Sequence, residues 1–159
     1  MTTNRAPRRT VILTLGVLGA AALALLAFAA TDDPVYTSTF SNLAVGGYDP
    51  VAFFTDGKPV KGKDEFEMEY QGATWRFASA EHLEKFRETP EKYAPQYGGY
   101  CAWAVAQGKT AAGDPRYWTV VDGKLYLNYS KGVQKRWAED IPGHITQADA
   151  NWPGLKGGN

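Results

Sequence analysis

Apolar and polar side chains alternate over residues 66–77, a pattern that predicts a β-hairpin. Gln71-Gly72 supplies a two-residue turn, and the apolar residues of the two arms then pair outward from it. The resulting pairs are Tyr70 with Ala73, Met68 with Trp75 and Phe66 with Phe77. All six apolar side chains therefore share one face of the sheet, which is the face we expect to be buried.

A second hairpin is predicted over residues 117–128, where Asp122-Gly123 is a two-residue turn signal between two apolar runs. This turn again places the large apolar residues of both arms on one face. The pairs are Val120 with Leu125 and Trp118 with Leu127.

A shorter and less regular hairpin is expected over residues 47–60, because two apolar runs flank Asp56-Gly57. Pro59 cannot donate a backbone hydrogen bond, so pairing on the second arm of this hairpin is limited.

Helical spacing of apolar residues predicts several short helices between the hairpins. Their expected ranges are 80–88, 90–93, 100–107 and 131–140. Ser79 and Ser130 are suitable N-caps, and Gly108 can end the third helix in a left-handed conformation. Pro142-Gly143 is expected to end the last helix, after which the tail wraps back over the domain. Hairpins followed by helices indicate an α+β fold.

Residues 10–30 form an apolar stretch of about 20 residues without a charge, long enough for a helix to cross a bilayer core of roughly 30 Å. Arginines precede this stretch and Asp32-Asp33 follows it. The positive-inside rule then places residues 1–9 in the cytoplasm and the domain on the periplasmic side of the inner membrane. Ala27-Phe28-Ala29 fits a signal-peptidase site, so two outcomes stay open: an uncleaved anchor, or a cleaved signal that leaves the domain in the periplasm.

These patterns give a simple domain organisation. The expected parts are a basic flank (1–9), a transmembrane anchor or signal segment (10–30), a linker (31–46), an α+β domain (47–155) and a disordered tail (156–159).

Charge argues against nucleic acid as a partner. The chain has 17 basic and 17 acidic residues, and three arginines in the first nine positions leave 14 basic residues for the rest. A domain with a slight acidic excess and no basic run lacks the usual surface for phosphates. The single cysteine, Cys101, cannot form an internal disulfide, so packing must stabilise the domain.

Several short motifs occur in an order that resembles the YHS domain family. They are Tyr48-Asp49-Pro50-Val51, Trp75-Arg76-Phe77-Ala78-Ser79, the helix through Phe86, and Pro90-Glu91-Lys92-Tyr93. The resemblance covers about residues 48–93. Tyr97-Gly98-Gly99-Tyr100-Cys101-Ala102 and the following hairpin and helix look like the longer exported branch of the family, which extends the resemblance to near Trp152.

The resemblance implies a metal site, because many YHS domains and the related TRASH-type modules are thought to bind metal through cysteines. Two patterns, Asp-Pro-Val-Cys and Phe-Cys-Ser-x-x-Cys, place those cysteines at positions that hold Ala52, Ala78 and His82 in this chain. Of these three positions, only His82 keeps a side chain that can ligate metal.

Four residues are candidate ligands for copper or zinc: Cys101, His82, Met68 and His144. Thiolate and imidazole groups suit copper(I) or zinc. The alternative is that Cys101 is a small buried hydrophobic residue, that His82 makes a structural hydrogen bond, and that Met68 packs in the core opposite Trp75.

A second candidate site is a small-ligand pocket lined by the aromatics near the glycine pair: Tyr97, Gly98, Gly99, Tyr100 and Trp103. Tight packing of a helix on the sheet would explain the same glycines. No catalytic motif is present in the sequence, so we expect a non-enzymatic protein. The predicted function is metal or small-ligand binding by an exported YHS-type domain. The alternative is a membrane-tethered protein-interaction module in which Cys101 is purely structural.

Overall fold

The computed structural model describes residues 34–156 and has an α+β fold with two antiparallel hairpins, which confirms the predicted fold class. The predicted flank and membrane segment (1–9 and 10–30) lie outside the described residues. Within residues 34–156, none of the helices is both long and apolar enough to span a bilayer.

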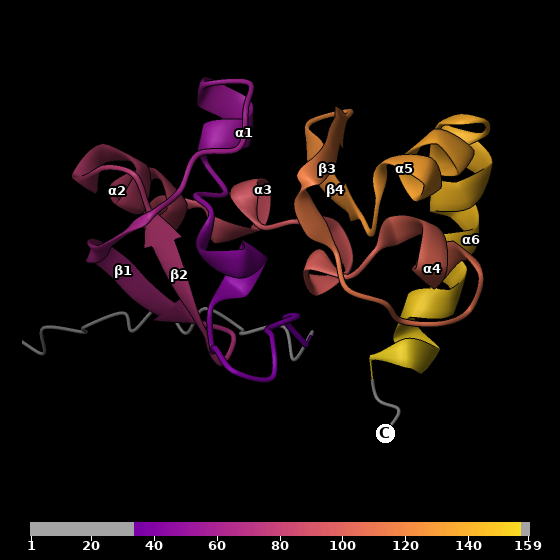
Figure 1. Ribbon diagram of the computed structural model, residues 1–159, viewed down its shortest axis with the longest axis horizontal. Helices are drawn as coiled ribbons and strands as arrows, with labels where there is room; N and C mark the ends of the chain where they lie inside the picture. Colours follow the sequence, from indigo (N-terminus) through magenta and orange to yellow (C-terminus); the bar gives the residue numbers. More distant parts are fainter. Residues whose placement is uncertain (1–33, 157–159) are drawn as a thin grey trace, which may run out of the picture.

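The chain forms two halves with the same order of elements (Figure 1). The N-terminal half comprises η1 (Ala44–Gly47), α1 (Ala52–Thr55), β1 (Lys63–Tyr70), β2 (Ala73–Phe77), α2 (Ala80–Glu88) and α3 (Pro90–Tyr93). The C-terminal half comprises η2 (Gln96–Gly99), α4 (Ala102–Ala106), β3 (Asp114–Val121), β4 (Lys124–Asn128), α5 (Lys131–Ala138) and α6 (Ile141–Leu155). In Figure 1 the first half lies at the left and the second at the right.

The two halves also repeat each other in backbone conformation. Val45 and Gly46 of η1 have φ of 53° and 59°, and Tyr97 and Gly98 of η2 have φ of 55° and 59°. Each hairpin turn pairs a non-glycine residue at φ 50° with a glycine at about 72°. Each hairpin is followed by a helix with a serine N-cap. Equivalent positions in the two halves can therefore be compared directly.

The register of the first hairpin is confirmed near its turn and wrong at its open end. Tyr70 pairs with Ala73 and Met68 with Trp75, as predicted. Phe77 pairs with Lys63 and not with Phe66, because β1 contains an irregularity between Lys63 and Glu67. Extra residues in one strand shift every pair beyond them.

The second hairpin has both predicted pairs, Val120 with Leu125 and Trp118 with Leu127. Its strands shift register between Asp114 and Trp118, at the place equivalent to the irregularity in β1. The shared irregularity is further evidence that the two halves have one architecture.

The serine caps behave as predicted. The Ser79 hydroxyl accepts from the His82 backbone N–H, and the Ser130 hydroxyl accepts from that of Val133. The third predicted helix is shorter than expected, since α4 begins only after Cys101, and Gly108 follows it with φ of 74°.

The predicted hairpin over residues 47–60 is wrong in its first arm, which contains the helical turn α1. The Asp49 Oδ1 atom accepts from the backbone N–H groups of Val51 (2.8 Å) and Ala52 (3.3 Å) and so begins this turn. Strand-like pairing of the two arms is limited to a bridge between Tyr48 and Lys61. An aspartate cap outweighed the hairpin signal.

The helix predicted over residues 131–140 does end near its expected limit, at Ala138, but Pro142-Gly143 lies in the first turn of a further helix, α6, which was not predicted. The Asp140 carboxylate accepts from the Gly143 N–H at 3.0 Å, and proline is well tolerated in a first turn. The tail does pack back on the domain, as a helix whose Trp152 is buried.

The folded part begins before Gly47, earlier than predicted. Ala44 and Val45 are buried in the core. The preceding segment crosses Gly98, where the Tyr36 N–H donates to the Gly98 carbonyl at 2.9 Å. A Cβ at Gly98 would lie 1.9 Å from the Pro34 oxygen, so only glycine fits this crossing.

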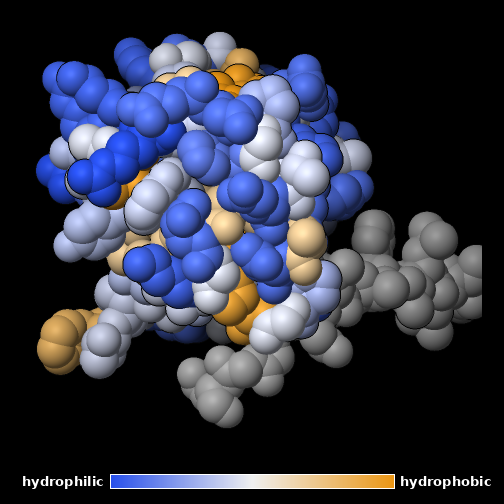
Figure 2. All heavy atoms as spheres, turned by 90° about the vertical axis from the view of Figure 1, so that its right-hand side faces the viewer, coloured by the Kyte–Doolittle hydropathy of each residue, from blue (hydrophilic) through white to orange (hydrophobic). Residues whose placement is uncertain are grey.

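Two groups of buried side chains form the core, one centred on Trp75 and Phe86 and the other on Trp137 and Tyr126. Leu125 and Leu127 of β4 belong to the first group and Tyr126 to the second. Strand β4 thus joins both halves into one core. The face of the molecule turned toward the viewer in Figure 2 is mainly hydrophilic, with small apolar areas between charged side chains.

Candidate functional site

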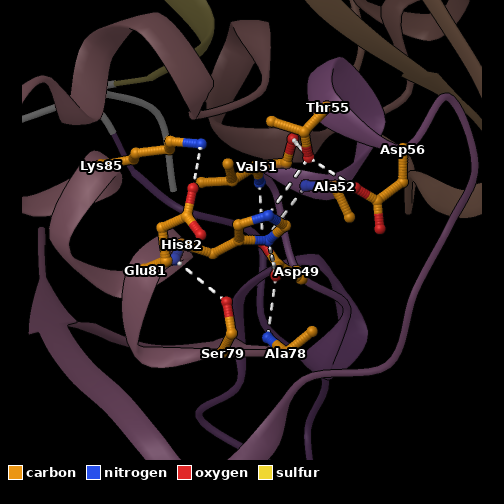
Figure 3. A network of polar contacts seen from close by, with 10 residues as sticks. All are labelled: Asp49, Val51, Ala52, Thr55, Asp56, Ala78, Ser79, Glu81, His82 and Lys85. Carbon is orange, nitrogen blue, oxygen red and sulfur yellow. Dashed lines mark hydrogen bonds and ion pairs between the residues drawn. The ribbon is translucent and has the colours of Figure 1, made fainter.

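A buried carboxylate, Asp49, organises the polar centre of the N-terminal half (Figure 3). Its Oδ1 accepts the two N–H groups at the start of α1. Its Oδ2 accepts from the Ala78 N–H at 2.8 Å and lies 2.6 Å from His82 Nδ1. The two oxygens together accept four hydrogen bonds, which is the full capacity of a carboxylate. This complete set of donors compensates for the loss of water around the buried charge.

The Asp49 carboxylate also fixes the orientation of the His82 ring. Ser79 caps α2 and places His82 in its first turn, where the side chain is 12% exposed. An ionised carboxylate can accept hydrogen bonds but cannot donate them. The proton between Asp49 and His82 therefore belongs to Nδ1, which donates it. The other ring nitrogen, Nε2, lies 3.3 Å from Thr55 Oγ1.

Thr55 is exposed at the end of α1, and its hydroxyl donates to Asp56 Oδ1 at 2.7 Å. An imidazole nitrogen, a hydroxyl and a carboxylate therefore meet at the surface where α1 approaches α2 (Figure 3). Glu81 and Lys85 form an ion pair of 2.7 Å nearby. The hydrogen bond from Lys85, and next the Lys85 charge, hold the pKa of Glu81 below its usual value.

The equivalent centre of the C-terminal half contains a thiol. Cys101 is 1% exposed and its Sγ lies 3.7 Å from Asn128 Oδ1. The same oxygen accepts from the Trp103 N–H at 3.3 Å. Asn128 is buried, and its Nδ2 has no hydrogen-bond partner within residues 34–156.

The structure does not bring the four predicted metal ligands together. His82 lies on α2 and Cys101 directly precedes α4, and these two helices lie on opposite sides of the molecule in Figure 1. Met68 packs against the N-terminal core. His144 Nδ1 lies 3.0 Å from the Trp137 carbonyl. Nowhere in the described part of the chain do three or more His, Cys, Asp or Glu side chains form a group suited to a metal ion.

The predicted ligand pocket is divided in the structure. Tyr97 and Gly98 line a cavity of about 130 Å³, whose lining does not include Gly99, Tyr100 or Trp103. The Pro34–Tyr36 segment covers Gly98, and so the chain itself makes the close approach that the glycine permits.

The aromatics of the predicted pocket are engaged in packing. The Tyr97 hydroxyl donates to Asp149 at 2.8 Å, and Tyr100 packs against Tyr36 and Trp152. Burial, and next the bond to Asp149, raise the pKa of Tyr97 far above its usual value.

Sequence reasoning missed Asp49, Thr55 and Asp56. Asp49-Pro50 ahead of an apolar turn is an N-cap signal that could have revealed α1. Asp49 and His82 are 33 residues apart in the sequence, so no short motif indicates that their side chains pair.

A family model described as the YHS domain matches residues 51–97, which confirms the resemblance over this stretch. The match runs from the start of α1 into η2, and the remainder of the C-terminal half lies beyond it. The comparisons with curated proteins and with solved structures found no match.

The metal site implied by the resemblance does not fit the structure. Ala52, Ala78 and His82 occupy the implied cysteine positions, and all three donate hydrogen bonds to Asp49. The N–H groups at these three positions point toward the Asp49 carboxylate. Hydrogen-bond donors offer no lone pair to a cation, so a metal ion cannot bind among them. A metal ion could use only the outward nitrogen of His82.

Proposed function

We propose that the chain is an exported, membrane-tethered and non-enzymatic YHS-type module that binds zinc or copper(II) at its surface through His82. The observation that carries this proposal is the Asp49–His82 hydrogen bond of 2.6 Å. It assigns a proton to Nδ1 and turns Nε2 toward Thr55 Oγ1 at the surface, where the neutral ring would offer a lone pair to a metal ion. Histidine ligands in metal sites usually donate their other ring N–H to a carboxylate in this way.

The groups around Nε2 support this choice of metal. Thr55 Oγ1 lies within 3.3 Å of Nε2 and within 2.7 Å of an Asp56 carboxylate oxygen. An imidazole with a nearby carboxylate suits zinc or copper(II), whereas copper(I) prefers sulfur. Cys101 belongs to the other half and is buried, so it is not part of the proposed site. The side chains of His82 and Asp56 would hold the ion, and water molecules would complete its coordination.

The same geometry argues against catalysis by Thr55. An Asp–His–Thr array resembles the order of groups in a nucleophilic triad. However, the Thr55 hydroxyl donates to Asp56, whose negative charge would oppose an oxyanion beside it. A binding role is therefore proposed in preference to an enzymatic one.

The proposed location rests on residues 10–30, whose uncharged stretch and preceding arginines favour an inner-membrane anchor with the domain in the periplasm. If the segment is cleaved, the same domain is released into the periplasm. Periplasmic exposure would give the surface site access to metal ions that enter from outside the cell.

Calorimetric titration of the chelator-treated full chain in detergent tests the proposal. We expect one equivalent of Zn²⁺ to bind, with binding lost in His82→Ala and weakened about tenfold or more in Asp56→Asn. His144→Ala is the matched control and should bind like the parent, as should Cys101→Ser. Unchanged binding in both His82→Ala and Asp56→Asn would refute the site. Because Asp56 is exposed, the second variant keeps the test valid if the first fails to fold.

A further inference from the structure

A second concave site lies between the two halves, away from the proposed ligands His82 and Asp56. Tyr48 of the N-terminal half, the start of β3 with Tyr129 of the C-terminal half, and Tyr36 of the preceding segment line a cleft of about 340 Å³. This volume is within the range of sites for small molecules.

Tyrosine rings form the walls of this cleft, and neighbouring groups hold two of them in place. Tyr36 packs edge-on against Tyr100 with ring centroids 5.3 Å apart. The ring of Tyr48 lies 4.1 Å from the Lys61 ammonium. Tyr129 is 58% exposed, which is unusual for so large an aromatic residue. Together with Pro115 and the Gly113 backbone, these rings favour a flat apolar ligand.

The charged side chains that line the cleft cancel each other, and one further ammonium group adjoins it. Arg116 and Asp114 both line it and neutralise each other through an ion pair of 2.6 Å. Lys61 lies at the edge, because its ammonium contacts the Tyr48 ring and donates to the Gly46 carbonyl at 3.5 Å. Within residues 34–156, no carboxylate forms an ion pair with Lys61. One positive charge is therefore available to a ligand.

We propose that this cleft binds a small planar aromatic carboxylate, whose ring lies between the tyrosines and whose carboxylate faces Lys61. Aromatic walls select the ring, and the uncompensated ammonium selects the anion. The inference goes beyond metal binding at His82 and does not depend on it.

The test uses the full chain in detergent and follows binding of 4-hydroxybenzoate by calorimetry. We expect saturable binding that weakens at least fivefold with the neutral 4-hydroxybenzamide, and also with cyclohexanecarboxylate, which keeps the charge but lacks the aromatic ring. Lys61→Met and Tyr129→Ala should each weaken 4-hydroxybenzoate about tenfold, and both residues are exposed.

Lys92→Met is the matched control, since Lys92 also lies over a tyrosine ring, that of Tyr93 at 5.1 Å, but does not line the cleft. It should bind 4-hydroxybenzoate like the parent. Equal binding of the acid and its amide, or equal binding by Lys61→Met and the parent, would overturn the charge argument. Absence of saturable binding at millimolar concentration would overturn the proposal as a whole.

Discussion

At equivalent positions of the two halves, Asp49 carries a carboxylate and Cys101 a thiol, although the backbone around them is nearly the same. In the first half Asp49 accepts the N–H of Val51. In the second half the corresponding N–H belongs to Trp103, and Asn128 at the end of β4 accepts it. The fold thus leaves the same buried backbone N–H in need of an acceptor in both halves. The side chain that accepts from it comes from a different element in each half.

The difference also explains why only the first half has a histidine at its centre. His82 is the third residue of α2, and Val133 occupies that place in α5. A buried carboxylate benefits from a ring N–H donor, whereas an amide next to a thiol has no charge to compensate. The N-terminal centre is consequently the one with an outward imidazole nitrogen.

The largest expected effect tests whether the two halves unfold together. Trp75 and Trp137 are buried, one in each half, and replacing either with alanine should lower the free energy of unfolding by about 3 to 5 kcal/mol. Because β4 contributes to both cores, each variant should shift one shared transition in denaturant. Separate transitions for the two halves would contradict this view. Lys135→Ala, on the exposed face of α5, is the control and should change stability by no more than about 0.5 kcal/mol.

The next effect tests the two polar centres directly. Asp49→Ala leaves four buried or partly buried donors without an acceptor and should cost roughly 3 kcal/mol. Asp56→Asn is the matched control, because that carboxylate is exposed, and should cost less than about 0.5 kcal/mol. Chemical denaturation measures both. A loss below about 1 kcal/mol in Asp49→Ala would mean that water replaces the carboxylate.

A smaller effect concerns alkaline pH and the C-terminal half. Burial and Asp149 raise the pKa of Tyr97 in the folded state, so folding favours the neutral phenol. Its contribution is complete below the usual tyrosine pKa of about 10 and is lost as pH rises above that value. We expect Tyr97→Phe to reduce the fall in stability between pH 10 and 11 by about 1 kcal/mol. Unfolding curves at several pH values measure this slope, and an unchanged slope would contradict the assignment.

The smallest expected effect concerns Cys101. It is buried beside Asn128, so the thiol should react with a labelling reagent only after unfolding. Cys101→Ala should lower stability by about 1 kcal/mol, because it removes one small buried group. Rapid labelling of the folded chain, or protection by added zinc, would instead support Cys101 as a metal ligand.

The sequence predicted features whose signals are local. The turn-proximal register of both hairpins and the serine caps at Ser79 and Ser130 are confirmed, because each depends on residues only a few positions apart. It failed where a cap competed with another pattern, as at Asp49-Pro50 and at Asp140. His82 was selected as a candidate ligand from the resemblance, but its partner Asp49 could be found only in the folded chain.

The repetition of the two halves was also not predicted. The stretches around η1 and η2 share Gly-Gly-Tyr, at residues 46–48 and 98–100, but most core positions of the two halves differ. Trp75 of β2 corresponds to Tyr126 of β4, for example. Hydrophobic periodicity indicates which face of a strand or helix is buried. It does not reveal that two segments of different sequence have the same fold.

The crossing at Gly98 has a mechanical consequence. The Pro34–Tyr36 segment is fastened to Gly98 in η2, the first element of the C-terminal half, before the chain pairs with Thr74 of β2 at Asn42 and Leu43. A force applied to the chain ahead of residue 34 would therefore first act on the bond between Tyr36 and Gly98, and η1 would remain shielded until that bond opened. Under tension the domain would release its amino-terminal segment in a separate step, and the cleft that Tyr36 helps to line would lose that wall first.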